Sequence, residues 1–199
     1  MTAAAIRQMR PADIEEAAVV LSQAMLRNPI HVAVYQGESE LERLQIEGAF
    51  LALLRNRLED VFMAIQGSQI VGVCRFYNCR GDRLISPGVQ INLDASDPEL
   101  SSPTDRSNYW KGLWARRDPR ILHSHLGPIG VLPEYQNLGI GNQLMERYCK
   151  VVDERKLPAF LETDTLNNVS FYRKFGFNLV DEIEILGVMN FFMWREIQG

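Results

Sequence analysis

LGPIGVLPEYQNLGIGNQLM, residues 126–145, contains the change of pattern from which the fold of this chain can be predicted. An apolar, β-branched run over residues 121–132 is typical of a largely buried strand, and Pro133 ends it. Apolar residues then recur at helical spacing, so a helix is expected to begin near Gly139 and Gly141. The stretch predicts a strand, a loop and a helix N-terminus in that order.

Such a turn is suited to binding phosphate. The first turn of a helix leaves backbone N–H groups unpaired and carries a partial positive charge. Glycines without a Cβ let the main chain of residues 136–142 approach an anion closely. The alternative is that the glycines only form a tight turn. Other phosphate loops fit poorly, because a Walker loop needs Lys and Ser or Thr where Asn142 and Gln143 stand, and a dinucleotide fingerprint needs glycine in place of Leu144.

The spacing Val131-x-Pro133-x-x-Gln136-x-x-Gly139-x-Gly141 resembles the acetyl-CoA signature of the GNAT superfamily, the GCN5-related N-acetyltransferases. The resemblance implies that the loop wraps the CoA pyrophosphate with backbone amides, and that the preceding strand pairs its main chain with the pantetheine arm. The loop residues are Gln136, Asn137, Leu138, Gly139, Ile140, Gly141 and Asn142, and the strand residues are Ile129, Gly130 and Val131. Pro128 supports a free strand edge, because proline cannot donate to a ladder.

A second motif, NVSFYRKFGF at residues 168–177, resembles the other GNAT signature, Asn-x-x-x-Tyr-x-x-x-Gly-Phe. The resemblance implies that Asn168 binds the pantetheine or phosphate arm and that the Tyr172 hydroxyl lies near the thioester sulfur. Hydrogen bonding to the developing thiolate is a safer role for Tyr172 than proton donation, because a phenol is the weaker acid. The alternative is that Tyr172 is one more aromatic residue of the core.

The implied reaction is attack of a neutral amine on the acetyl thioester, for which a general base is worth seeking. Glu162, on the strand after the CoA helix, is the first candidate, followed by His123 and His125. These two histidines are two residues apart on one strand, so both face the same way. The alternative for each is a hydrogen-bonded polar residue in a splayed sheet.

Composition predicts a single domain over residues 1–199, with 80–118 as a long insertion, since the chain is 199 residues long and 46% hydrophobic. The net charge of −4 argues against nucleic acid, and no apolar run approaches the ~18 residues of a membrane span. Cys74, Cys79 and Cys149 lack metal-ligand spacing, so we expect reduced packing thiols, a cytoplasmic protein and no metal.

The fold class expected is α+β, with a mixed, mostly antiparallel central sheet, a splayed middle and flanking helices. The strands are expected at 4–9, 60–65, 69–77, 121–132, 159–163, 177–186 and 188–196, and the helices at 11–28, 39–57, from near 138 to 155, and to about 175 from a cap at Asn167 or Asn168. Residues 80–118 are either a cover for the acceptor site, with a short helix at their tryptophans, or a decorative insertion. His31 and Tyr35 are substrate-site candidates or residues of a surface link.

The function expected is acetyl-CoA-dependent transfer of an acetyl group to a primary amine of a small molecule or peptide. Its partners would be acetyl-CoA and the amine acceptor, with the protein a monomer or homodimer. A different class is a non-catalytic CoA-binding sensor or structural module that keeps the phosphate loop.

Overall fold

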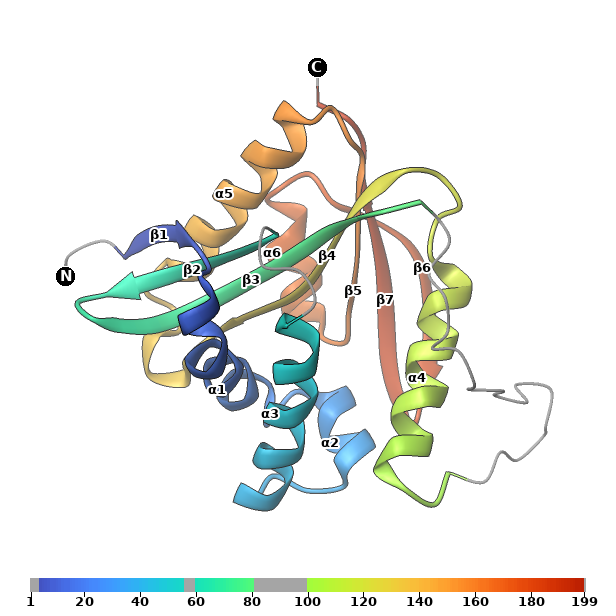
Figure 1. Ribbon diagram of the computed structural model, residues 1–199. Coiled ribbons are helices and arrows are strands. Elements are labelled where there is room, and N and C mark those ends of the chain that lie inside the picture. Colours follow the sequence, from blue (N-terminus) through green and yellow to red (C-terminus); the bar gives the residue numbers. More distant parts are fainter. Residues whose placement is uncertain (1–3, 56–59, 81–99, 199) are drawn as a thin grey trace.

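The computed structural model describes residues 4–55, 60–80 and 100–198, which form a central sheet with helices on both faces (Figure 1). The seven strands lie in the order β1-β2-β3-β4-β5-β7-β6. The neighbours β4 and β5 run parallel, and the other neighbouring pairs are antiparallel. This mixed, mostly antiparallel sheet confirms the predicted fold class.

The elements follow the predicted order. The strands are β1 Ala5–Gln8, β2 Val61–Gln66, β3 Gln69–Cys79, β4 His123–Val131, β5 Ala159–Thr163, β6 Asn178–Ile185 and β7 Val188–Arg195. The helices are α1 Ile14–Met25, α2 Pro29–Tyr35, α3 Glu40–Leu54, α4 Pro103–Arg117, α5 Ile140–Glu154 and α6 Leu166–Arg173, with short 3-10 turns at Pro11–Asp13 and Pro133–Tyr135. Within the described ranges, no helix is both long and apolar enough to cross a membrane.

In the middle of the sheet, the parallel strands β4 and β5 separate after a short stretch of pairing. Its paired residues are Ser124 to Leu126 on β4 with Ala159 to Leu161 on β5. Beyond them, Glu162 and the residue after it pair with β7, while residues 129–131 of β4 pair with β3. From Gly127 to Val131, the edge of β4 that faces β5 therefore has no strand partner.

Helices α1 and α5 cover opposite faces of the sheet. A Cβ added at Gly130 would lie 2.8 Å from the Cβ of Ala24, so only glycine lets α1 pack this closely. Tyr148 of α5 donates a hydrogen bond to the Ser124 hydroxyl across 3.2 Å. Ser124 thus faces α5, and because side chains alternate along a strand, His123 and His125 face the other side.

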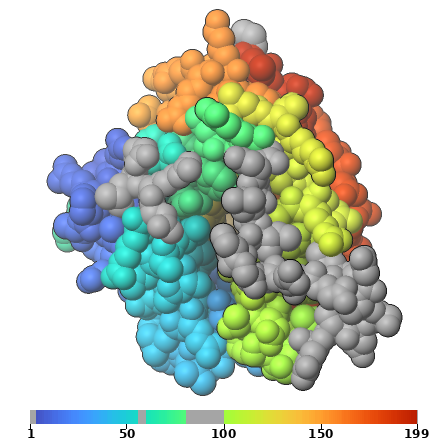
Figure 2. Space-filling view, turned by 45° about the vertical axis from the view of Figure 1, so that its right-hand side comes forward, coloured from blue at the N-terminus to red at the C-terminus, as the bar shows by residue number. Residues whose placement is uncertain are grey.

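Helix α4 is longer than the short helix expected around its tryptophans. It begins with a capping box, in which Ser102 accepts a hydrogen bond from the Asp105 N–H at 3.1 Å and Asp105 accepts one from the Ser102 N–H. Trp114 Nε1 donates to Asn190 Oδ1 of β7 across 2.9 Å, which fixes the helix to the sheet. Trp110 packs with residues of α2, and the two helices lie side by side with α3 on one face of the molecule (Figure 2).

Helix α3 ends at Leu54, and its predicted end near Arg57 lies outside the described residues. One predicted helix cap was wrong. Helix α6 begins at Leu166 and is capped by Thr165, whose hydroxyl accepts the Asn168 N–H at 3.2 Å. Thr165 is the cap, and not Asn167 or Asn168, because its extended backbone places its hydroxyl near the third N–H of the helix. The sequence alone does not reveal this geometry.

Candidate active site

The predicted phosphate loop ends at a helix N-terminus with no side-chain cap. Gly139 precedes the first residue of α5 with φ of 82°, a left-handed conformation that favours glycine. Helices α2, α3, α4 and α6, by contrast, are capped by the side chains of Asn28, Ser39, Ser102 and Thr165. The first N–H groups of α5 are therefore available to an external anion.

The surroundings of the loop leave room for such an anion. No atom of the described residues lies within 4 Å of a Cβ built at Gly139. A Cβ built at Gly141, two residues further on, would lie 3.6 Å from the ring of Phe171, so α6 packs against the first turn of α5. Gln136 turns away, donating its Nε2 to the Val131 carbonyl at 3.1 Å. This hydrogen bond ties the loop to the last residue of β4, so the strand and the loop that leads to α5 are held together.

Helix α6 carries the two residues of the second motif. Asn168 Nδ2 donates to Thr163 Oγ1 at 3.0 Å, which ties the helix to the end of β5. Tyr172 is buried beside Phe171 and Phe177, at ring-centroid distances of 5.2 and 6.1 Å. Within the described residues its hydroxyl has no hydrogen-bond partner. Burial raises the pKa of Tyr172, with smaller contributions from Cys74 and Asp164, so the phenol is a poor proton donor.

The candidate bases of β4 and β5 meet in one hydrogen-bonded row. His125 Nε2 lies 2.9 Å from Glu162 Oε2, and His125 Nδ1 lies 3.0 Å from Asp118 Oδ1. These three side chains are at most 3% exposed. Both ring nitrogens of His125 therefore lie within hydrogen-bond distance of a carboxylate oxygen, which fixes the ring between Asp118 and Glu162.

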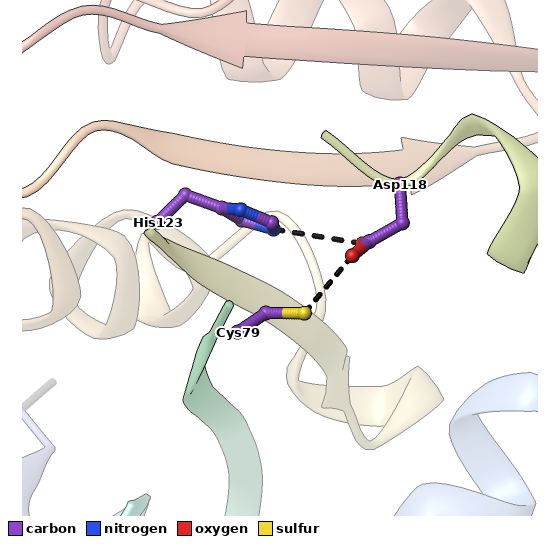
Figure 3. Close-up of side chains that lie close together, drawn as sticks. All are labelled: Cys79, Asp118 and His123. Carbon is purple, nitrogen blue, oxygen red and sulfur yellow. Dashed lines mark hydrogen bonds and ion pairs between the residues drawn. The ribbon is translucent and has the colours of Figure 1, made fainter. Parts of the chain in front are cut away.

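His123 lies in the same row, two residues before His125 on β4 and therefore further from the point where β4 and β5 separate. Its Nε2 is 3.5 Å from Asp118 Oδ1, beyond the reach of a regular hydrogen bond. On the other side of Asp118, the Cys79 thiol donates to Oδ2 at 2.9 Å (Figure 3). Burial alone raises the pKa of Asp118, but its contacts with His123, His125 and Cys79 outweigh burial and hold that pKa well below its usual range.

Sequence reasoning found Glu162, His123 and His125 but missed Asp118 and Cys79. The structure brings all five into contact on the sheet face opposite α5. Asp118 follows the last residue of α4 and is placed by that helix's return to the sheet, which no local pattern predicts. The only sequence signal was an acidic residue shortly before a strand with two inward-facing histidines.

The two weaker candidates, His31 and Tyr35, lie in an aromatic cluster between α2, α3 and α4. The His31 ring centroid is 5.4 Å from Trp110, 5.9 Å from Phe50 and 6.3 Å from Tyr35. Burial, followed by the charge of Lys111, lowers the pKa of His31 to about 4, so it is neutral near pH 7. His31 is thus a packing residue of the helical cover, and the structure does not join it to the Glu162 row.

Asp164 connects this helical cover to the sheet. Its carboxylate accepts the Ile30 N–H and the Asn28 Nδ2, each at 2.8 Å. These bonds fix the start of α2 beside the end of β5, two residues beyond Glu162. Helix α2 therefore covers the sheet near the candidate base.

Known proteins share the fold of this chain. A model of the acetyltransferase (GNAT) family matches residues 25–177, which include both motifs. A histone acetyltransferase HPA2-related protein of Corynebacterium glutamicum is 14% identical with a TM-score of 0.72, over 100% of this chain and 98% of its own. Arylalkylamine N-acetyltransferase 2 of Aedes aegypti is 15% identical with a TM-score of 0.70, over 98% and 99%. A Brucella melitensis GNAT acetyltransferase in complex with acetyl-CoA is 20% identical with a TM-score of 0.57, over 98% and 89%.

The fold and the strand–loop–helix site define the class of this protein as an acetyltransferase. The family match extends over most of the chain and makes the assignment particular: the chain belongs to the GNAT acetyltransferase family.

Proposed function

We propose that this protein transfers the acetyl group of acetyl-CoA to a primary amine of a small molecule or peptide. The observation that carries the proposal is the parting of β4 from β5 directly before the uncapped N-terminus of α5. An open strand edge accepts an extended ligand by main-chain hydrogen bonds, and a helix N-terminus binds phosphate. A ligand with an amide-containing arm and a pyrophosphate fits both.

We assign the two parts of the cosubstrate to two stretches of backbone. Residues 129–131 pair with the pantetheine arm along the free edge of β4, and residues 136–142 bind the pyrophosphate with their N–H groups. Asn168, already bonded to Thr163, borders the slot from α6. This arrangement directs the thioester toward the point where β4 and β5 separate, next to Glu162.

Glu162 is the general base of the proposed reaction. An alkylammonium is neutral in about one molecule per thousand at pH 7, so forming the nucleophile costs about 4 kcal/mol without assistance. The amine nitrogen attacks the thioester carbonyl carbon, the C–S bond breaks with its electron pair on sulfur, and the nitrogen loses a proton to Glu162. His125 positions that carboxylate through its hydrogen bond.

Tyr172 stabilises the leaving group. Its hydroxyl is unpaired within the described residues, and burial makes its proton hard to remove. It therefore serves as a hydrogen-bond donor to the developing thiolate rather than as an acid that gives up its proton.

The comparisons do not identify the acceptor amine. One structural neighbour is an arylalkylamine N-acetyltransferase, and another, from Escherichia coli, is a ribosomal-protein-S18-alanine N-acetyltransferase, 17% identical with a TM-score of 0.57. By their names, these two proteins act on an arylalkylamine and on an alanine of ribosomal protein S18. We therefore propose an amine acceptor of either kind.

The test is a thermal melt with acetyl-CoA followed by an amine panel. A ligand that binds only the native state raises the free energy of unfolding by RT ln(1 + [L]/Kd), so the melting temperature is expected to rise with acetyl-CoA concentration. CoA release with arylalkylamines, polyamines and N-terminal peptides then identifies the acceptor class. Binding without turnover across the panel would support the sensor alternative, and melts that respond to ATP but not acetyl-CoA would contradict the proposal.

A further inference from the structure

A second set of side chains converges beside the Glu162 row without a part in the acetyl transfer. Cys79 and His123 are directly opposite each other in the antiparallel β3–β4 pair, and Asp118 reaches them from the end of α4 (Figure 3). One ligand atom from each of the three lies within 4.8 Å of the others. All three residues are buried, with Cys79 4%, Asp118 7% and His123 0% exposed.

The tautomer of His123 orients a lone pair into this cluster. His123 Nδ1 lies 2.8 Å from the Ile121 carbonyl oxygen, which only accepts hydrogen bonds, so Nδ1 carries the proton. A neutral ring then presents an unprotonated Nε2 to the cluster. That atom is fully buried and has no hydrogen-bond partner among the described residues. A backbone carbonyl that holds the remote nitrogen is the usual support of a metal-binding histidine.

The ligand set and its spacing match a first-row metal ion. Tetrahedral zinc, with bonds of about 2.0 Å to N or O and 2.3 Å to S, places N and O ligands about 3.3 Å apart and S and O ligands about 3.5 Å apart. The His123 Nε2 to Asp118 Oδ1 distance is 3.5 Å. Cys79 Sγ is 2.9 Å from Asp118 Oδ2, the other oxygen of the same carboxylate. An ion would therefore need the thiol to move outward by about 0.6 Å and the carboxylate to turn so that one oxygen faces both ligands.

Asp118 also joins this cluster to the Glu162 row, because its Oδ1 lies 3.0 Å from His125 Nδ1 and its Oδ2 accepts a hydrogen bond from the Cys79 thiol.

We propose that Cys79, Asp118 and His123 bind a zinc ion, with a water molecule in the fourth position. Cys79 directly precedes the long insertion at residues 80–118, and Asp118 is its last residue. The ion therefore joins the two ends of the insertion and fixes α4 to the sheet. Through Asp118 it also fixes His125, and hence the orientation of Glu162. The site departs from the expectation of no metal, and it does not depend on the acetyl-transfer proposal.

The test uses cobalt(II) as a spectroscopic probe on the tag-free, chelator-treated protein. We expect one Co²⁺ per chain, a tetrahedral d–d spectrum with a thiolate-to-cobalt charge-transfer band, and displacement by Zn²⁺. Cys79→Ser is expected to abolish the charge-transfer band and to weaken affinity by more than the ~10-fold that loss of an outer-shell partner costs. Cys149→Ser, a matched change of another buried thiol, should retain both.

A second readout separates this site from surface binding. Zinc should raise the melting temperature of the wild-type protein and of Cys149→Ser, but not of Cys79→Ser. Hydrogen exchange should slow in α4 when zinc is added. Folded wild-type protein that binds no Co²⁺, or whose bound Co²⁺ lacks the thiolate band, would overturn the proposal.

Discussion

His125 Nε2 on β4 lies 2.9 Å from Glu162 Oε2 on β5, and this bond spans the two strands where their pairing ends. The last paired residues are Leu126 and Leu161, so Glu162 is the first residue of β5 past the parallel ladder. Where the backbone pairing ends, this hydrogen bond connects the two strands. It fixes the Glu162 carboxylate beside the gap between β4 and β5.

Replacing Glu162 with glutamine should remove the base while keeping its shape. We expect kcat to fall by about 10²–10⁴-fold, because a positioned base contributes that much to proton transfer. Acetyl-CoA affinity, measured by calorimetry, should remain within a few-fold of wild type. Glu15→Gln, an exposed change on α1, is the control. A Glu162→Gln variant with wild-type kcat would return Glu162 to a structural role.

Gly141→Val should block the phosphate site. A Cβ built at Gly141 lies 3.6 Å from the Phe171 ring, so the branches of valine would crowd the space between the first turn of α5 and α6, beside the backbone that the pyrophosphate must approach. We expect at least a ~100-fold loss of acetyl-CoA affinity, equal to about 2.7 kcal/mol. Gly48→Val, at an exposed position of α3 with no atom within 4 Å of its Cβ, controls for the intrinsic cost of valine in a helix. Full affinity in a folded Gly141→Val protein would refute the loop assignment.

Gly139 is a less suitable position for this test. Its φ of 82° is strained for any side chain, so a substitution there would change the fold as well as the site.

Tyr172→Phe should lower turnover far more than acetyl-CoA affinity. The hydroxyl acts when negative charge forms on sulfur, which is a transition-state interaction. A hydrogen bond to a charged group contributes ~1.5 to 3 kcal/mol, so kcat should fall about tenfold to a hundredfold. Phenylalanine keeps the contacts with Phe171 and Phe177, and melting temperatures should confirm this. Unchanged turnover, measured where chemistry limits the rate, would make Tyr172 a core residue only.

The stability of the protein should fall as pH drops from about 6.5 to 4 because of His31. Its pKa is about 4 in the folded protein and 6.5 when unfolded, so the unfolded state takes up the proton first. The loss reaches about 3 kcal/mol near pH 4. Urea unfolding across this pH range should show the slope in wild type and a smaller one in His31→Phe, which keeps an aromatic ring there.

The difference between these two proteins isolates His31 from its neighbours. Lys111 stays charged over this range, and Tyr35 stays neutral. Asp164 has a pKa raised by burial, so its own effect has the opposite sign, but it titrates in both proteins. Equal slopes for wild type and His31→Phe would show that His31 is hydrated and not desolvated by the helical cover.

Local patterns accounted for the elements that carry the cosubstrate site. The apolar run ending at Pro133 predicted β4, and helical spacing after two glycines predicted α5. The two last strands, expected at 177–186 and 188–196, were also confirmed as β6 and β7, and Gly187 in the turn between them has a φ of 75°. These signals are strong because periodicity and turn chemistry act within a few residues of each other.

Predictions that depended on one terminal contact were less accurate. The cap of α6 is Thr165, because backbone dihedrals decide which hydroxyl reaches the helix N–H groups. The length of α4 was underestimated, because its polar residues hide a helix stabilised by the capping box of Ser102 and by packing on α2 and β7.

The sequence by itself determined the family, the order of the elements and the common facing of His123 and His125. Only the tertiary structure decided that Asp118 lies between those histidines and that Cys79 lies opposite His123. Both depend on strand register and on the return of α4 across the sheet. The contacts of Cys79 join residues about 40 positions apart. Asp118 is only seven residues from His125, but its position depends on the packing of α4 against the sheet, which no short window of sequence contains.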